Sequence, residues 1–141
     1  MNSIKLTLYQ NSPRGEQNQY NTYILDRQKY GNHQCWDIGN YKCATMRDKS
    51  GFWWGYVRIP DNYPRFQIEH INNWFHGGIK YYQDRTVGFS CNYLGDFVPN
   101  AFFHTKGEVY RTFEDVKDEM ENIIIYRLED IKNNIFRLLD F

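Results

Sequence analysis

Residues 112–141 read TFEDVKDEMENIIIYRLEDIKNNIFRLLDF, and this stretch decides the fold class. Thr112 followed by Asp115 resembles a capping box, and acidic residues fill the first turns, where a helix dipole favours anions. Apolar residues recur at steps of three and four, as on one face of an α-helix, at Phe113, Val116, Met120, Ile123, Ile124, Leu128, Ile131, Ile135, Leu138 and Leu139. The pattern predicts an amphipathic helix. Its buried face should lie on a sheet through Val116, Met120, Ile123 and Ile124.

The length of the predicted helix leads to a second expectation. A continuous helix over the stretch would be about 40 Å long, which exceeds the width of a compact domain of 141 residues. We therefore expect the helix either to break around Asp130–Asn134 or to extend and pack on a partner chain. The apolar run Ile123–Tyr126 widens the stripe and favours the partner, so we expect a homodimer or a higher homo-oligomer.

The sequence before residue 111 is typical of strands joined by turns. Ile4, Leu6 and Leu8 alternate with polar residues and predict a half-buried strand, whereas the polar residues 10–22 predict a long loop. Further strands are predicted from aromatic and β-branched runs at Tyr23–Leu25, Tyr41–Arg47, Phe52–Ile59, Ile79–Tyr82 and Val87–Asn92. The expected fold is a single α+β domain over 1–141, with an antiparallel β-sheet and loops in 1–110 and the helix, whole or broken in two, in 112–141.

Composition excludes several classes of protein. The chain has 17 Lys and Arg against 17 Asp and Glu, so it is no generally basic nucleic-acid coat, although a local basic patch remains compatible with this balance. The mean hydropathy is −0.77, and no apolar run approaches the roughly 20 residues of a membrane-spanning helix. Cys35, Cys43 and Cys91 form no Cys-x-x-Cys pair, which favours a reducing cytoplasm. We expect no membrane partner, no long nucleic-acid partner, no metal and no cofactor.

Residues 51–104 concentrate aromatic, glycine and polar residues in the segments GFWWGYVRIP (51–60), WFHGGI (74–79) and VGFSCNYLGD (87–96). Nucleobases stack on aromatic rings, and phosphates bind arginines and bare backbone N–H groups. The segments predict a nucleotide-type pocket built from Arg58, His76, Gly77, Gly78, Tyr81, Phe89, Asn92, Asp96 and Arg111. We expect Arg58 and Arg111, from one subunit or from two different subunits, to flank the phosphates, and Phe89 or Tyr81 to stack on the base. In the alternative, the aromatics are core and Arg58 pairs with Asp96 or a helix carboxylate.

A catalytic interpretation uses some of the same residues. Cys91, His76 and Asp96 have the types of a thiol nucleophile, a base and its orienting group. A free cysteine flanked by Phe89 and Tyr93 is also typical of a small buried hydrophobe. Paired His-x-Thr motifs, metal-ligand spacings and phosphate-binding glycine loops are absent from the sequence. We therefore expect no catalytic residue and no enzyme activity.

The ordered set WGYVRIP (54–60), HGGI (76–79), GFSC (88–91) and GD (95–96), followed by an acidic amphipathic helix, resembles the phage Thoeris anti-defence proteins that sequester a signal. The resemblance covers about 51–120, and Lys80 and Ser90 stand where that group has Thr and Asp. It implies a phage protein in the cytoplasm of the infected bacterium. Such a protein binds, without cleaving it, a cyclic ADP-ribose isomer made by a TIR-domain enzyme, in pockets near subunit contacts of a homo-oligomer. A hydrolase or modifying enzyme for a related nucleotide and a protein-binding phage inhibitor remain as alternatives.

Overall fold

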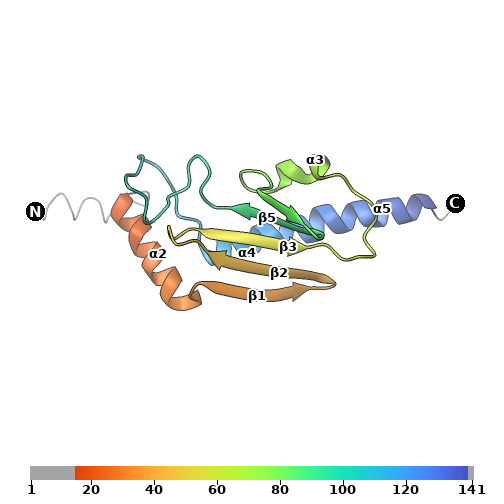
Figure 1. The fold of residues 1–141 in the computed structure, drawn as a ribbon, viewed down its shortest axis with the longest axis horizontal. Coiled ribbons are helices and arrows are strands. Elements are labelled where there is room, and N and C mark those ends of the chain that lie inside the picture. The colour runs from red at the N-terminus through yellow and green to blue at the C-terminus, as the bar shows by residue number, and fades with distance from the viewer. Residues whose placement is uncertain (1–14, 140–141) are drawn as a thin grey trace, which may run out of the picture.

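The fold is an antiparallel sheet with one long helix across its back (Figure 1). The computed structural model describes residues 15–139, and the side chains of residues 15–135. The sheet has the five strands β1 (His33–Ile38), β2 (Tyr41–Arg47), β3 (Trp53–Arg58), β4 (Tyr81–Gln83) and β5 (Thr86–Ser90). They lie in the order β1-β2-β3-β5-β4. Every neighbouring pair is antiparallel. The predicted α+β class is confirmed. The predicted strands within 41–92 appear with shifts of up to two residues at their ends.

The long helix runs through α4 (Phe113–Ile123), the π-helical segment η2 (Ile124–Leu128) and α5 (Glu129–Leu139). Thr112 and Asp115 form the predicted capping box, each side chain accepting from the other's backbone N–H at 3.1 Å. The expected break around Asp130–Asn134 is wrong, because the helix continues through these residues. The Tyr63 hydroxyl donates to the Leu128 carbonyl at the end of η2 (2.7 Å). In Figure 1, α5 extends past the end of the sheet.

The core lies between the sheet and α4. Val116, Met120, Ile123 and Ile124 are all buried, as the periodicity predicts. Gly55 in β3 allows the close approach, because a Cβ there would lie 2.6 Å from the Phe89 ring and 3.1 Å from the Met120 sulfur. A side chain at this position would push the helix or Phe89 away from the sheet.

Two predictions in the N-terminal half are wrong. Residues 16–22, expected in a loop, and Tyr23–Leu25, expected as a strand, form the helix α2 (Glu16–Tyr30). Strand β1 was not predicted at all. Two short helical segments, α3 (Ile68–Ile71) and η1 (Asn72–Trp74), link β3 to β4. The strand expected at residues 4–8 lies outside the described residues. Within residues 15–139, no helix is both long and apolar enough to cross a membrane.

Helix α2 is held by a buried polar cluster, here called the Asp26 cluster, made of Asp26, Arg47, Trp53 and Tyr110. The Asp26 carboxylate lies 3.5 Å from the Arg47 guanidinium and accepts from the Trp53 indole N–H (2.9 Å) and the Tyr110 hydroxyl (2.6 Å). It also accepts from the backbone N–H of Phe113, the first residue of α4 (3.2 Å). The cluster therefore ties α2 to two strands and to the start of the long helix.

Candidate functional site

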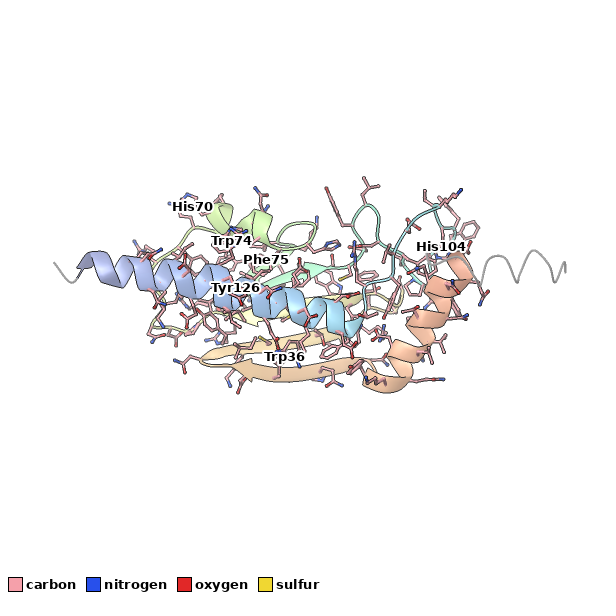
Figure 2. All side chains as sticks on the ribbon, turned by 180° about the vertical axis from the view of Figure 1, so that it is seen from behind. Trp36, His70, Trp74, Phe75, His104 and Tyr126 are labelled. Carbon is pink, nitrogen blue, oxygen red and sulfur yellow. The ribbon has the colours of Figure 1, made fainter. Side chains whose placement is uncertain are left out.

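A cleft of about 530 Å³ opens between the 74–76 loop, the end of β5 and the polar side of α4 and η2. Figure 2 views the protein from the side of the sheet that the long helix covers, and it shows Tyr126 on this helix and Trp74 on the neighbouring segment η1. The lining combines aromatic, basic and acidic groups, from Trp74, His76, Cys91, Arg111, Asp115, Val116, Asp118, Glu119, Asn122, Ile123, Tyr126 and Arg127. This volume is within the range of small-molecule sites.

Behind the cleft lies a second buried carboxylate, and with its two partners it is called the Asp96 cluster (Asp96, His76 and Arg111). The Asp96 side chain is 0% exposed, with one oxygen 2.5 Å from His76 Nε2 and the other 2.9 Å from Arg111 Nε. It also accepts from the backbone N–H of Tyr93 (3.0 Å). A bridge between Asp96 and Val109 joins the loop after β5 to the segment that leads into α4. Two sequence-distant loops thus place His76 and Arg111 at one wall.

The Asp96 cluster changes the protonation of the groups around it. The hydrogen bond to Asp96 raises the pKa of His76, although burial opposes the shift. Burial raises the pKa of Glu119, and the nearby His76 opposes this. The wall therefore presents an imidazole that favours its cationic form and a carboxyl that keeps its proton to a higher pH than an exposed glutamate.

Cys91 lines the cleft but is a poor nucleophile. Burial raises the pKa of its thiol, and the negative charge of Asp96 adds to the effect. The thiolate is the reactive form of cysteine. Cys91 therefore behaves as a small buried residue that forms the floor of the cleft.

The two glycines after His76 shape the turn next to the cleft. Gly77 and Gly78 have φ of 69° and 85°, which favour glycine, and a Cβ on Gly77 would lie 2.9 Å from the Tyr93 side chain. The Gly78 N–H donates to the Phe75 carbonyl (2.8 Å), and the next N–H, of Ile79, donates to the Asn72 side chain (2.9 Å). The Gly78 N–H is therefore used within the turn, whereas the sequence suggested that both glycines would offer N–H groups to a phosphate.

The structure places the predicted site residues at or near the cleft, on the opposite face of the sheet, or in the core. His76 and Arg111 line the cleft with Asp96 behind them, Gly77 and Gly78 form the adjoining turn, and Asn92 is exposed nearby, where its side chain accepts from Ser90 (2.7 Å). Arg58 and Tyr81 lie on the opposite face of the sheet. Phe89 is fully buried in the core, so its expected stacking on a base is wrong.

The two arginines expected to flank one phosphate are separated within the chain. Arg58 pairs with Thr86 at the start of β5, whereas Arg111 lies beside Cys91, just beyond the end of that strand. Arg58 bonds to the Asp84 carbonyl and lies 3.7 Å from the Asp61 carboxylate. Arg58 therefore pairs with neither Asp96 nor a helix carboxylate, so the alternative expectation that it pairs with one of these carboxylates is also wrong.

Sequence reasoning missed Trp74, Glu119, Tyr126 and Arg127. A weak signal existed in the helix, where Asp115, Glu119, Asn122 and Tyr126 recur at steps of three and four on the flank of the apolar stripe. Polar stripes of this kind are common on solvated helices, so the spacing alone does not single out a site. Within residues 15–139, no group of three or more His, Cys, Asp or Glu side chains is arranged to hold a metal ion.

Comparisons of the chain with models of known protein families, with curated proteins and with solved structures find no match. The chain is an α+β protein with a cleft beside a helix-covered sheet.

Proposed function

We propose that the chain binds a small nucleotide in the cleft and sequesters it without turnover. The observation that carries the proposal is the pairing of aromatic and basic groups at one opening, where the Arg127 guanidinium lies 5.8 Å from the centre of the Trp74 ring. A planar base stacks on an aromatic face, and arginine binds phosphate.

The other wall of the cleft supports the same class of ligand. Arg111 uses its Nε to bond Asp96, which leaves its terminal N–H groups for an anion. Asp115, Asp118 and Glu119 supply carboxyl oxygens that accept hydrogen bonds from ribose hydroxyls. The acidic groups disfavour a bare polyphosphate and favour a ligand with more sugar and base than phosphate.

The resemblance to the Thoeris anti-defence proteins supplies a specific candidate for the ligand. We propose a cyclic ADP-ribose isomer, which has a base, two riboses and a pyrophosphate. The biological role would be that of a phage protein which counters TIR-based defence in the bacterial cytoplasm. The mixed lining of the cleft suits each part of this ligand, and the high pKa of the Cys91 thiol supports binding over covalent chemistry.

A hydrolase for the same class of ligand is the second candidate. The His76–Asp96 pair favours it, because a carboxylate that orients an imidazole is a common arrangement for a general base. The two candidates share a cleft and differ in turnover.

One experiment separates them. The protein is incubated with cyclic ADP-ribose isomers, the free ligand is measured, and the sample is then heated and the released material is analysed by mass spectrometry. Depletion followed by release of intact ligand supports sequestration, and altered ligand supports the hydrolase. A Trp74→Ala variant should lose depletion, with Trp36→Ala, outside the cleft, as the matched aromatic control. Without any depletion by the wild type, the nucleotide proposal fails and a protein-binding role replaces it.

We also propose that the chain self-associates through the long helix. Ile125 and Tyr126 are exposed on η2 and α5 extends past the sheet, so a second copy here would cover part of the cleft lining. Light scattering that gives a 17.1 kDa monomer at micromolar concentration would contradict this assembly.

A further inference from the structure

The face of the sheet that points away from α4 carries an aromatic surface which the cleft does not use. Trp54 and Tyr56 alternate along β3 with the buried residues Trp53, Gly55 and Val57, so their rings point to the outer face. In Figure 1 the strands lie in front of α4 and α5, and this outer face is the one that the view presents.

Three rings meet on this face, and they are called the outer aromatic platform (Trp54, Tyr56 and Tyr81). The Trp54 and Tyr56 rings are nearly parallel, with centroids 6.0 Å apart and an interplanar angle of 10°. Tyr81 from the edge strand β4 meets Tyr56 edge-on at 5.7 Å. The rings are half-buried or exposed, so part of each π-face or edge reaches solvent.

Small residues make room for the platform on the sheet. Tyr56 pairs with Ala44 on β2 and with Gly88 on β5. A Cβ on Gly88 would lie 2.8 Å from the Tyr56 ring and 3.1 Å from the Tyr81 Cβ, so a side chain at this position would lift the rings off the sheet. The sequence thus builds an open aromatic surface across three strands.

Two cationic side chains lie beside the platform. Lys42 and Arg58 face each other in register across β2 and β3, and both side chains are exposed. Like charges at directly opposed positions destabilise a strand pair. Their carboxylate neighbours, Asp37 and Asp61, are exposed and lie 3.9 and 3.7 Å away, a type of ion pair that contributes little. An anion placed between the two cations would relieve their repulsion.

We propose that this outer face binds a short segment of single-stranded nucleic acid, with bases stacked on the aromatic platform and a phosphate between Lys42 and Arg58. The binding of single strands elsewhere combines these two components, stacking rings and cations along the backbone. An antiparallel sheet with central aromatics on an open face stacks two or three bases in one common module. The open surface favours several linked bases over a mononucleotide, which needs enclosure for tight binding. The segment is short, in keeping with the charge balance of the whole chain.

The test is fluorescence anisotropy with fluorescein-labelled oligothymidylate and oligouridylate of about eight nucleotides, which cover one such binding face. Titrations start at about 50 mM salt, because phosphate contacts weaken steeply as salt rises. We expect saturable binding by the wild type. Tyr56→Ala should weaken it by roughly ten-fold or more, since a stacked base is lost, and Tyr56→Phe should retain it.

Tyr82→Ala is the matched control. Tyr82 is an exposed tyrosine on the same strand as Tyr81, but it faces the other side and packs near Phe66 (6.4 Å). Lys42→Gln and Arg58→Gln, which change exposed side chains, should each lower the slope of log affinity against log salt by about 0.7. Circular dichroism spectra check that every variant is folded.

Four outcomes would overturn the proposal. They are no anisotropy change at the lowest salt, equal binding of a duplex of the same length, equal loss in Tyr82→Ala and Tyr56→Ala, and a dimer in sedimentation that Tyr56→Ala dissociates, which would make this face a contact between copies of the chain. The proposal is independent of the cleft. Trp74→Ala should keep oligonucleotide binding while losing the nucleotide, and Tyr56→Ala should do the reverse.

Discussion

Two buried aspartates, Asp26 and Asp96, organise this protein, and their surroundings differ in one respect. Both carboxylates are shielded from solvent and both meet an arginine. The Arg47 partner of Asp26 is 3% exposed, whereas Arg111 and His76, the partners of Asp96, are 38% and 21% exposed. The Asp26 cluster is closed, and the Asp96 cluster opens onto the cleft.

The comparison shows how the same pair of residue types supports different roles. Arg47 donates hydrogen bonds to the Gly31 and Gly51 carbonyls and to the Tyr110 hydroxyl. Its guanidinium also lies over the Trp53 ring, 4.1 Å from the ring centre. Arg111 bonds to Asp96 through its Nε (2.9 Å), and its guanidinium lines the cleft. We infer that the closed cluster maintains the fold and the open one serves binding.

The largest expected effect is on the closed cluster. Asp26→Ala leaves the Arg47 charge and three hydrogen-bond donors without their acceptor, so the free energy of unfolding should fall by about 3–5 kcal/mol. Urea unfolding followed by circular dichroism measures it. Lys29→Ala, which removes an exposed ion pair with Glu114, is the control and should cost less than about 1 kcal/mol. Equal losses in the two variants would remove the contrast between closed and exposed pairs.

The next effect concerns ligand affinity at the open cluster. Arg111→Ala should weaken nucleotide binding by roughly ten- to a hundred-fold, as expected for a lost hydrogen bond to a charged group. Its melting temperature should also fall, because the buried Asp96 carboxylate loses one of its two cationic partners, so the affinity is measured on the folded variant. Arg58→Ala is the matched control, since this arginine lies at the far end of β3, and it should leave the cleft ligand bound. Calorimetry that shows the loss in Arg58→Ala instead would place the nucleotide elsewhere.

The third expectation is a pH dependence from His76. Because its pKa is raised in the folded state, the stabilisation from the His76–Asp96 pair is fully present below the ordinary histidine pKa, about 6.5. This stabilisation is lost as the pH rises through the raised pKa of His76. The stability difference between the wild type and His76→Gln should therefore shrink as the pH rises above neutral. NMR titration that finds the His76 pKa at or below its ordinary value would contradict the expectation.

The smallest effect is expected at Cys91. Cys91→Ala should keep ligand affinity within about a few-fold, because a protonated, buried thiol contributes packing and no strong hydrogen bond. Calorimetry on the folded variant measures the affinity. Complete loss of binding or of turnover in a folded Cys91→Ala protein would restore the nucleophile.

The sequence predicted the elements whose signals are apolar and local. Helix α4 follows from its capping box and its apolar stripe, and β2 follows from the alternation of buried residues with Lys42 and Met46. The sequence failed at α2 for a physical reason. The residues that α2 buries are Gln19, Tyr23 and Asp26, so two of the three are polar, and hydrogen bonds hold this helix together with the ring contacts of Tyr23. A search for apolar periodicity cannot detect such a helix.

The sequence assigned nine residues to one pocket, and the structure brings only some of them together. His76, Asp96 and Arg111 meet as the sequence suggested. Arg58 was assigned to the same pocket because a charged residue inside an apolar strand needs a partner, a ligand or exposure, and the sequence does not show which of these it has. The register shows that it belongs to the opposite face and the other end of the strand pair. The oligomer, the ligand and the absence of turnover remain predictions.

The π-helical segment η2 bears on how this chain tolerates changes in its length. A deletion within an ordinary α-helix rotates all later residues by about 100° around the axis. A π turn already holds one residue more than the α-helical ladder needs. Removing the exposed Ile125 should therefore convert η2 to regular helix and leave the faces of α5 in place, whereas removing Asn122 from α4 should turn them away. Insertions and deletions in this protein should be best tolerated at the wide turn of its longest helix.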